Sequence, residues 1–141
     1  MKHEPYVIER TYNAPVDKVW QALTDPAKMK HWYFDIPGFK PEVGNTTSFT
    51  AGDKTAVYKH EFKVLEAVPN KLLKHSWSYP DLSGMSTLTI ELTADGDKTH
   101  LKLIHEGLES FAENGPAFMP ESFNAGWTAI IGKNLPDYLS K

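Results

Sequence analysis

Hydrophobic and polar residues alternate along four consecutive stretches in the middle of the chain: "TAVYKHEFKVLEAVP", "KLLKHSWSYP", "GMSTLTIELTA" and "KTHLKLIHEGL". A period of two is typical of strands that are buried on one face only. The short connections "PN", "PDLS" and "DGD" contain turn residues, and turns of this length join antiparallel neighbours. The pattern therefore predicts an antiparallel meander over residues 55–108.

Helical spacing of apolar residues appears on both sides of this meander. In "APVDKVWQAL" Pro15 suits the first helical position, and "TDPAKMKHW" restarts as a second short helix. Residues 5–13 alternate like a strand, residues 35–52 leave room only for short strands, and residues 123–139 predict a long helix. This order packs most naturally as an antiparallel sheet with helices on one face, so the expected fold class is α+β.

The predicted C-terminal helix keeps Gly126 and Gly132, although each costs about 1 kcal/mol relative to Ala inside a helix. We expect these glycines to mark a close approach of the helix backbone to the sheet. Pro136 is expected to bend or end the last turn. The residues that share the sheet-facing side at helical spacing are Phe123, Trp127, Ile130, Ile131, Asn134 and Tyr138.

Alternation and the turn lengths together set a provisional register for the buried face of the sheet. Large apolar residues give way, row by row, to small and polar ones. We therefore expect the sheet to be sealed at one end and to leave a pocket at the other end, beneath the C-terminal helix. The three expected rows are Val64, His75, Leu88 and Leu103, then Phe62, Trp77, Ser86 and His105, then His60, Tyr79, Gly84 and Gly107.

Composition and charge narrow the class of protein. The chain has 141 residues, 40% of them hydrophobic, and a net charge of -3 without a long run of Lys and Arg. These values favour one domain over residues 1–141 and argue against nucleic-acid binding through a basic face. No apolar stretch approaches the ~20 residues that span a bilayer, and the first residues are too charged for a signal peptide. Because cysteine is also absent, we expect a cytoplasmic protein without disulfides or Cys-ligated metals.

Four longer motifs follow one another along the chain: "APVDKVWQALTDPAKMKHWYF", "FKVLEAVPNKLLKHSW", "THLKLIHEGL" and "GWTAIIGKNLPDYL". Together they resemble the START-like (SRPBCC) superfamily, in the branch similar to the C-terminal domain of activators of Hsp90 ATPase. The resemblance covers nearly the whole chain. It implies a helix-grip fold, in which a curved antiparallel β-sheet wraps around a long C-terminal α-helix and two short helices follow the first strand. Members of the superfamily commonly hold lipids, sterols, polyketides or plant-type aromatics in the cavity, and some are enzymes.

The chain departs from this branch in ways that concern the cavity and the partner. It reads "VGN" at Gly44 and Asn45, where the branch usually has a double glycine, and it has Phe62 where glycine is frequent, which narrows the expected cavity. Eukaryotic Hsp90 activators carry a further N-terminal domain for chaperone contact, and we expect this chain to have no room for one. The resemblance thus leaves Hsp90, with a link to stress response, as an alternative partner.

Three of the six histidines, His60, His75 and His105, fall on the inward face of the predicted sheet. Strand spacing places them about 10 to 14 Å apart, too far to share a zinc ion held at about 2 Å from each ligand. We therefore expect no metal and no cofactor. Ser86 can neighbour His105, but no acidic residue shares their face, so no nucleophilic triad is expected. His75 is interpreted as a core imidazole, whereas His105 is a candidate to hydrogen-bond a ligand or to act as a general base.

The leading hypothesis is a non-enzymatic carrier or sensor of a small hydrophobic molecule, lipid-like or similar to an aromatic polyketide or flavonoid. A monomer or weak dimer is expected. Two alternatives stay open: a cyclase-type or hydrolase-type enzyme that uses His60 or His105, and an Hsp90-linked chaperone-interaction module. No residue is assigned as catalytic. The expected ligand-binding residues are Trp32, Phe34, Phe49, Tyr58, His60, Phe62, Trp77, Tyr79, Ser86, His105, Phe118, Phe123, Trp127 and Ile131.

Overall fold

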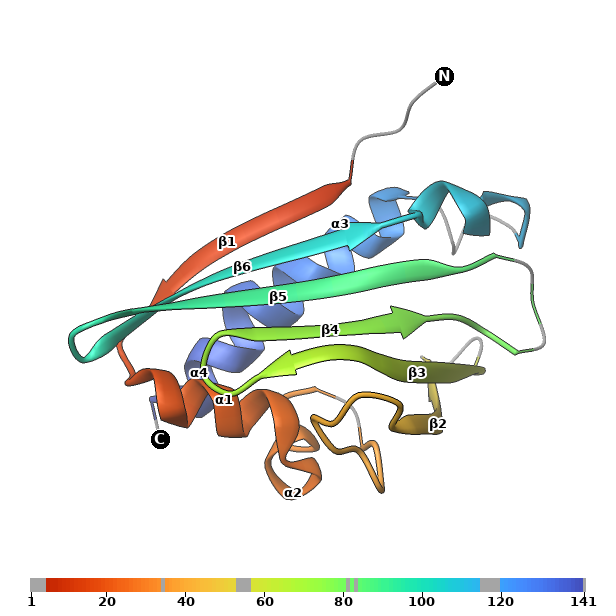
Figure 1. The fold of residues 1–141 in the computed structure, drawn as a ribbon. Coiled ribbons are helices and arrows are strands. Elements are labelled where there is room, and N and C mark those ends of the chain that lie inside the picture. The colour runs from red at the N-terminus through yellow and green to blue at the C-terminus, as the bar shows by residue number, and fades with distance from the viewer. Residues whose placement is uncertain are drawn as a thin grey trace.

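Six strands form one curved antiparallel sheet (Figure 1). The computed structural model describes residues 5–33, 35–52, 57–80, 82, 84–114 and 120–140. Each strand pairs antiparallel with its neighbours, so the predicted meander is confirmed, and the first strand pairs with the last. In spatial order the strands are β1 (Tyr6–Tyr12), β6 (Lys98–Glu106), β5 (Ser86–Asp95), β4 (Leu72–Trp77), β3 (Val57–Val68) and β2 (Thr46–Gly52).

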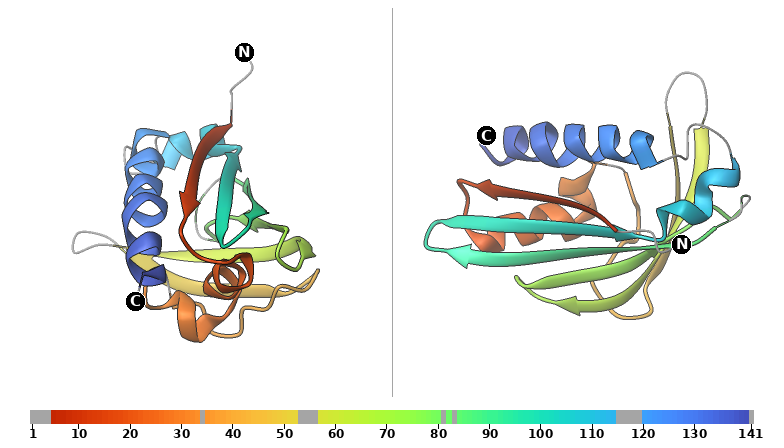
Figure 2. Two further views of the ribbon diagram at one scale, coloured as in Figure 1. Left: turned by 90° about the vertical axis from the view of Figure 1, so that its left-hand side faces the viewer. Right: turned by 90° about the horizontal axis from the view of Figure 1, so that it is seen from above.

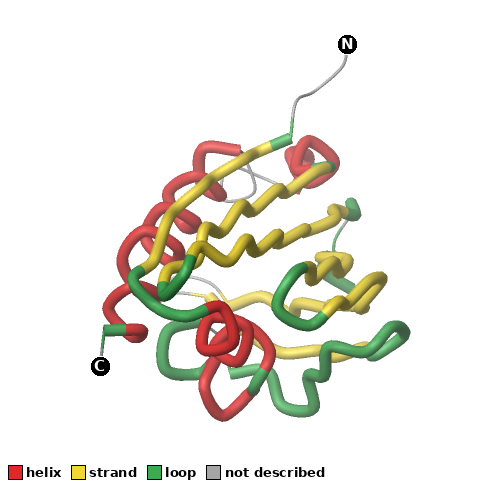
Figure 3. The backbone as a smooth tube through the Cα atoms, turned by 60° about the vertical axis from the view of Figure 1, so that its left-hand side comes forward, coloured by secondary structure: helices red, strands yellow, loops and turns green. Residues whose placement is uncertain are grey.

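The helices cover one side and one end of this sheet. Figure 2 shows the sheet bending around the C-terminal helix, and Figure 3 shows the two helices that follow the first strand lying together at one end of the molecule, away from the short helix that follows β6. The predicted α+β helix-grip fold is therefore confirmed. The short helices are α1 (Val16–Thr24), α2 (Pro26–Met29) and the 3-10 helix η1 (Leu108–Asn114). The C-terminal helix consists of α3 (Pro120–Ala129), the π-helical η3 (Ile130–Asn134) and α4 (Leu135–Leu139).

Local sequence explains where the two short helices begin. The Asp25 side chain accepts a hydrogen bond of 3.0 Å from the backbone N–H of Ala27, and Pro26 occupies the first turn of α2, where its missing N–H costs nothing. Helix α1 begins at Val16, one residue later than we predicted, so Pro15 is the N-cap residue and not the first helical residue. The two helices thus determine where the segment that follows Met29 begins.

The predicted register is confirmed between β3 and β4 and between β4 and β5, but it is wrong between β5 and β6. His75 pairs with Val64 and Leu88 as expected. Leu88, however, pairs with His105, two residues from the expected partner Leu103. The reason is the hairpin turn, in which Asp95 pairs with Lys98 and the two residues between them form the loop. Because the shift is an even number, every side chain keeps its predicted face.

The buried side of the C-terminal helix follows the i, i+4 spacing of Trp127, Ile131, Leu135 and Leu139. Phe123, Ile130 and Tyr138 are half-buried, whereas Asn134 is exposed, so the predicted stripe was only partly right. The prediction that two glycines approach the sheet is wrong. A Cβ on Gly126 would meet nothing within 4 Å, and one on Gly132 would meet only the Arg10 side chain, at 3.6 Å, because both glycines lie on the exposed side of the helix.

The π-helical turn η3 has a specific link to the sheet. Its hydrogen bonds include one from the Leu135 N–H to the Ile130 carbonyl, five residues back. In this register the next carbonyl, Ile131, faces residue 136, which is a proline and has no N–H. The Tyr12 hydroxyl from β1 donates to the Ile131 carbonyl at 2.7 Å and supplies the missing donor.

Candidate functional site

The end of the sheet where we expected open space is filled by aromatic rings. The Trp77 ring lies 4.9 Å from Phe62, 5.2 Å from His105 and 5.6 Å from Trp127, measured between ring centroids. The prediction of a hollow here is therefore wrong for the described residues. We call this group the aromatic cluster; its members are Phe49, His60, Phe62, Trp77, Tyr79, His105, Phe111, Phe123 and Trp127.

The helix η1, which the sequence analysis did not predict, explains the filling. Phe111 of η1 is fully buried, and its ring lies 5.1 Å from that of Tyr79. A Cβ on Gly84 would lie only 2.6 Å from the Phe111 ring, and one on Gly107 would lie 2.8 Å from the Met85 carbonyl oxygen. The space that a side chain would take at these two glycines is thus occupied by neighbouring protein atoms, and no room is left there for a ligand.

A chain of hydrogen bonds runs through the aromatic cluster and fixes the state of His105. The Trp127 indole donates to His105 Nδ1 at 3.1 Å, so the His105 proton lies on Nε2, which donates to the Ser86 hydroxyl at 2.8 Å. Ser86 in turn donates to the Trp77 carbonyl at 2.9 Å. Burial, with a smaller contribution from nearby His75, lowers the pKa of His105 to about 3. Because its one lone pair is already occupied, His105 holds the C-terminal helix onto the sheet, and this geometry gives no support to a general base.

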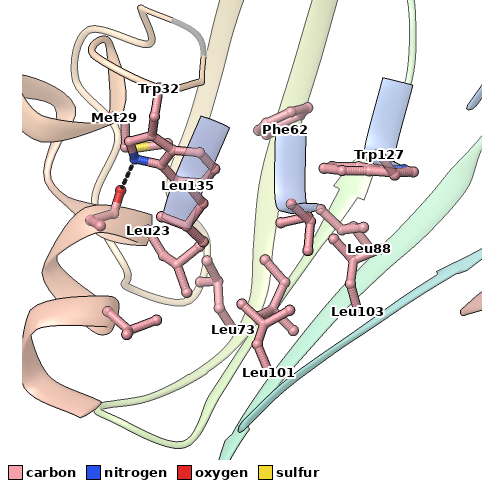
Figure 4. Close-up of a cluster of buried hydrophobic side chains, with 14 of the residues drawn as sticks. Leu23, Met29, Trp32, Phe62, Leu73, Leu88, Leu101, Leu103, Trp127 and Leu135 are labelled. Carbon is pink, nitrogen blue, oxygen red and sulfur yellow. Dashed lines mark hydrogen bonds between the residues drawn. The ribbon is translucent and has the colours of Figure 1, made fainter. Parts of the chain in front are cut away.

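A small cavity remains elsewhere on the concave face, between the C-terminal helix and strands β3 to β5. Its volume is about 10 Å³, close to the space that one water molecule requires. Figure 4 shows part of its surroundings, with Leu73 and Leu88 projecting from the sheet, Leu23 from α1 and Trp127 from the C-terminal helix. The cavity is lined by Leu23, Met29, Trp32, Tyr33, Phe39, Phe62, Leu73, His75, Leu88, Ile90, Trp127 and Ile131.

His75 brings an imidazole to this mostly apolar lining. Its Nδ1 donates to the Ser76 carbonyl at 2.8 Å, so Nε2 carries a lone pair that can accept a hydrogen bond. The ring stacks on Phe62 at 4.2 Å, and burial lowers the pKa of His75 to about 4 although the bond to Ser76 opposes this shift. His75, which we predicted to be a core imidazole, thus also lines the cavity.

Trp32 and Tyr33 separate the cavity from the surface. Both residues line the cavity and also a surface groove of about 350 Å³. Their rings stack at 5.1 Å, and the Trp32 indole donates to the Ala22 carbonyl of α1 at 2.9 Å, drawn as the dashed line in Figure 4. Tyr33 is half-buried, and its ring stacks on Trp127 at 6.1 Å. We call these two residues the wall.

The surface groove is polar and lies between the segment after α2 and the end of the C-terminal helix. His31 and Tyr138 stack across it with nearly parallel rings 6.2 Å apart. The groove and the cavity therefore adjoin at the same two aromatic residues, Trp32 and Tyr33. The groove is lined by Lys30, His31, Trp32, Tyr33, Asn134, Asp137 and Tyr138.

The structure divides the predicted ligand-binding residues into three groups. Trp32, Phe62, Trp127 and Ile131 line the cavity. Phe34 and Phe118 lie outside the described residues. The remaining ones belong to the aromatic cluster or contact it: Phe49, Tyr58, His60, Trp77, Tyr79, Ser86, His105 and Phe123.

Sequence reasoning missed most of the lining on the side of the short helices. Leu23 and Met29 followed helical spacing, and Phe39 lay in a Pro- and Gly-rich stretch, so alternation along strands could not point to them. In the described ranges no three His, Cys, Asp or Glu side chains gather closely enough to hold a metal ion. Within the same ranges, no helix combines the length and apolar character needed to cross a bilayer.

Comparisons with known proteins agree with this fold. The family described as activator of Hsp90 ATPase homolog 1-like protein matches residues 13–140. No curated protein matches the sequence at a significant level.

Solved structures from several bacteria share the architecture. Protein Mll3558 from Rhizobium loti is 24% identical, with a TM-score of 0.81 over 98% of each chain. CalU16 from Micromonospora echinospora is 27% identical, with a TM-score of 0.73 over 95% of this chain and 74% of its own. DynU16, a protein of the dynemicin biosynthetic locus, is 24% identical, with a TM-score of 0.79 over 99% of this chain and 48% of its own.

Proposed function

Because this chain belongs to the activator of Hsp90 ATPase homolog 1-like family, we propose that it binds a small hydrophobic molecule between the C-terminal helix and the concave face of the sheet. The observation that carries the proposal is the cavity beside Trp127 and Ile131, which is aromatic-lined and only one layer of side chains from a surface groove. Ligand sites are commonly concave and apolar with a few polar groups, and His75 supplies such a group here.

The ligand must enlarge the cavity in order to enter, because the closed form holds about one water molecule. Apolar burial yields about 25 cal/mol per Å², so a ligand that buries about 200 Å² gains about 5 kcal/mol before the cost of opening. The aromatic lining suits a flat or lipid-like molecule. Its orientation is set by the lone pair on His75 Nε2, which accepts from a hydroxyl of the ligand.

The proposal describes a carrier or sensor that acts in the cytoplasm as one domain, monomeric or weakly dimeric. The aromatic and apolar lining with one imidazole supports a flat, polyketide-like or flavonoid-like ligand. The enzyme alternative draws little support from His105, whose two ring nitrogens are both engaged. The Hsp90 alternative rests on the family description alone.

Native mass spectrometry of freshly purified protein, followed by thermal shift against lipids, flavonoids and polyketides, tests the proposal. A ligand at 100 times its Kd stabilises the folded state by about 2.7 kcal/mol, which raises Tm by several degrees. Ile131→Phe extends a ring into the cavity and should abolish the shift. Ile130→Phe is the matched control, because Ile130 adjoins it in the helix but does not line the cavity.

Two outcomes decide the matter. A copurified mass, or a shift that Ile131→Phe removes and Ile130→Phe retains, supports the proposal. If no compound shifts Tm and no mass copurifies, the proposed function is wrong. Should Ile131→Phe fail to fold, Leu73→Phe fills the same cavity from β4 and takes its place.

A further inference from the structure

The surface groove differs from the cavity in polarity although the two share the wall. Lys30, His31, Asn134 and Asp137 place charged or hydrogen-bonding groups along the groove. Among the described residues that line the cavity, His75 and Tyr33 are the ionisable ones. A molecule that occupied both spaces at once would therefore need a polar end outside and an apolar body inside.

The charges in the groove favour an acidic end. Among the described residues that line the groove, Asp137 is the one carboxylate, and it already forms an ion pair with Lys133 at 3.1 Å. Lys30 is exposed, and among the described residues no carboxylate pairs with it. The groove thus presents an ammonium group that no described carboxylate pairs with, beside the imidazole of His31 as a further hydrogen-bond partner.

The wall is built from parts that can separate without breaking the sheet. Trp32 is tied to α1 by one hydrogen bond, from its indole to the Ala22 carbonyl. Tyr33 is half-buried and makes ring contacts with Trp32 and Trp127. Neither residue belongs to a strand, so moving their rings costs packing but no ladder hydrogen bonds.

We propose that the surface groove binds the acidic end of an amphipathic ligand, with Lys30 as the cation that receives it, while the apolar body passes the wall into the cavity. This inference rests on the proposed function and names the chemical class of the ligand: an organic anion, such as a carboxylate or sulfonate, attached to a flat or aliphatic apolar body. The ligand enters between His31 and the end of the C-terminal helix.

Two fluorescent probes with the same aromatic body test this assignment. Anilinonaphthalene sulfonate carries an anionic group, and N-phenylnaphthylamine lacks it. Both are titrated into the full chain and into Lys30→Gln and Lys98→Gln, at low and at high ionic strength. Lys98 is the matched control, since it is an exposed lysine at the β5–β6 hairpin and does not line the groove. Circular dichroism confirms that each variant is folded.

Lys30→Gln should weaken the sulfonate probe about two- to fivefold at low salt, the range of an exposed ion pair, and should leave the neutral probe unchanged. Lys98→Gln should leave the affinity for both probes unchanged. At high salt, Lys30→Gln and the unaltered protein should bind the sulfonate probe equally well. Equal affinities of the sulfonate for both variants would overturn the inference while leaving the proposed function intact, provided that Ile131→Phe abolishes binding of the neutral probe. If neither probe binds, the proposed function fails as well. Lys30-dependent flotation with phosphatidylserine vesicles, without any effect on the soluble sulfonate, would indicate a membrane surface and would also overturn the inference.

Discussion

Removing the Tyr12 hydroxyl tests how the C-terminal helix is fastened to the sheet. This hydroxyl donates at 2.7 Å to the Ile131 carbonyl, which Pro136 cannot serve. Tyr12→Phe keeps the buried ring and deletes only the donor. The carbonyl is then left buried without a partner, which costs about 1–3 kcal/mol of the free energy of unfolding.

For a chain of this length, each kcal/mol of lost stability lowers Tm by about 2–5 °C, so we expect a decrease of roughly 2–15 °C. Urea unfolding followed by circular dichroism should show a lower midpoint with an unchanged m value, because the variant exposes the same surface on unfolding. Tyr6→Phe is the matched control. Tyr6 lies in the same strand and is half-buried, and its substitution should change stability by no more than about 0.5 kcal/mol.

A second background isolates the proposed cause. Pro136→Ala restores an N–H that can bond the Ile131 carbonyl, so Tyr12→Phe should cost less in this background than in the wild-type chain. The reasoning is refuted if Tyr12→Phe is as mild as Tyr6→Phe. It is also refuted if Tyr12→Phe costs the same with and without Pro136, because the proline would then not explain the bond.

Three further predictions concern two buried histidines, a core phenylalanine and two glycines. Burial lowers the pKa values of His75 and His105 to about 4 and about 3, below the ~6.5 of an unfolded histidine, so the unfolded state binds more protons. The free energy of unfolding should therefore have its full value above about pH 6.5 and fall steadily as the pH is lowered. The urea midpoint measured against pH tests this, and a midpoint that does not change from pH 7 to pH 4 contradicts it. Phe62→Ala should lower the free energy of unfolding by about 3–5 kcal/mol, because Phe62 is buried. By enlarging the cavity it should also strengthen binding of N-phenylnaphthylamine, as measured by fluorescence titration. Phe62→Leu is a milder substitution for use if the alanine variant does not fold. Gly84→Ala should destabilise the protein severely, because the φ of Gly84 is +103° and a Cβ there would lie 2.6 Å from Phe111. Gly126→Ala, on the exposed side of a helix, should instead raise the free energy of unfolding by about 0.5–1 kcal/mol. Thermal unfolding that gives both variants the same Tm would contradict this description of the packing.

The fold could be predicted because its signals are local. Alternation along β3 to β6 and short turns specify antiparallel neighbours, and the order of elements then leaves few ways to pack the helices. The register of β6 failed because the sequence "DGD" allows the turn to be centred at more than one place. In the structure Gly96 takes a φ of +60° at the first loop position, and this selects the two-residue loop between Asp95 and Lys98.

The site was harder to predict because it depends on volumes that only the complete packing determines. Small residues at Gly84 and Gly107 indicated empty space, but the sequence gives no sign that Phe111 fills it. Glycines in a helix likewise indicated contact with the sheet, although Gly126 faces open space. By contrast, Trp127 was correctly placed against the sheet, because a large apolar residue at helical spacing has few other places to lie.

The indole N–H resonances of the tryptophans offer the most direct measurement of ligand binding between the helix and the sheet. Trp32 and Trp127 line the cavity, while Trp20 packs in the core outside it. In NMR spectra of isotopically labelled protein titrated with N-phenylnaphthylamine, we predict that the signals of Trp32 and Trp127 shift in a saturable way and that the signal of Trp20 stays in place. A titration in which Trp32 and Trp127 do not move, while the probe binds elsewhere or not at all, would contradict the account.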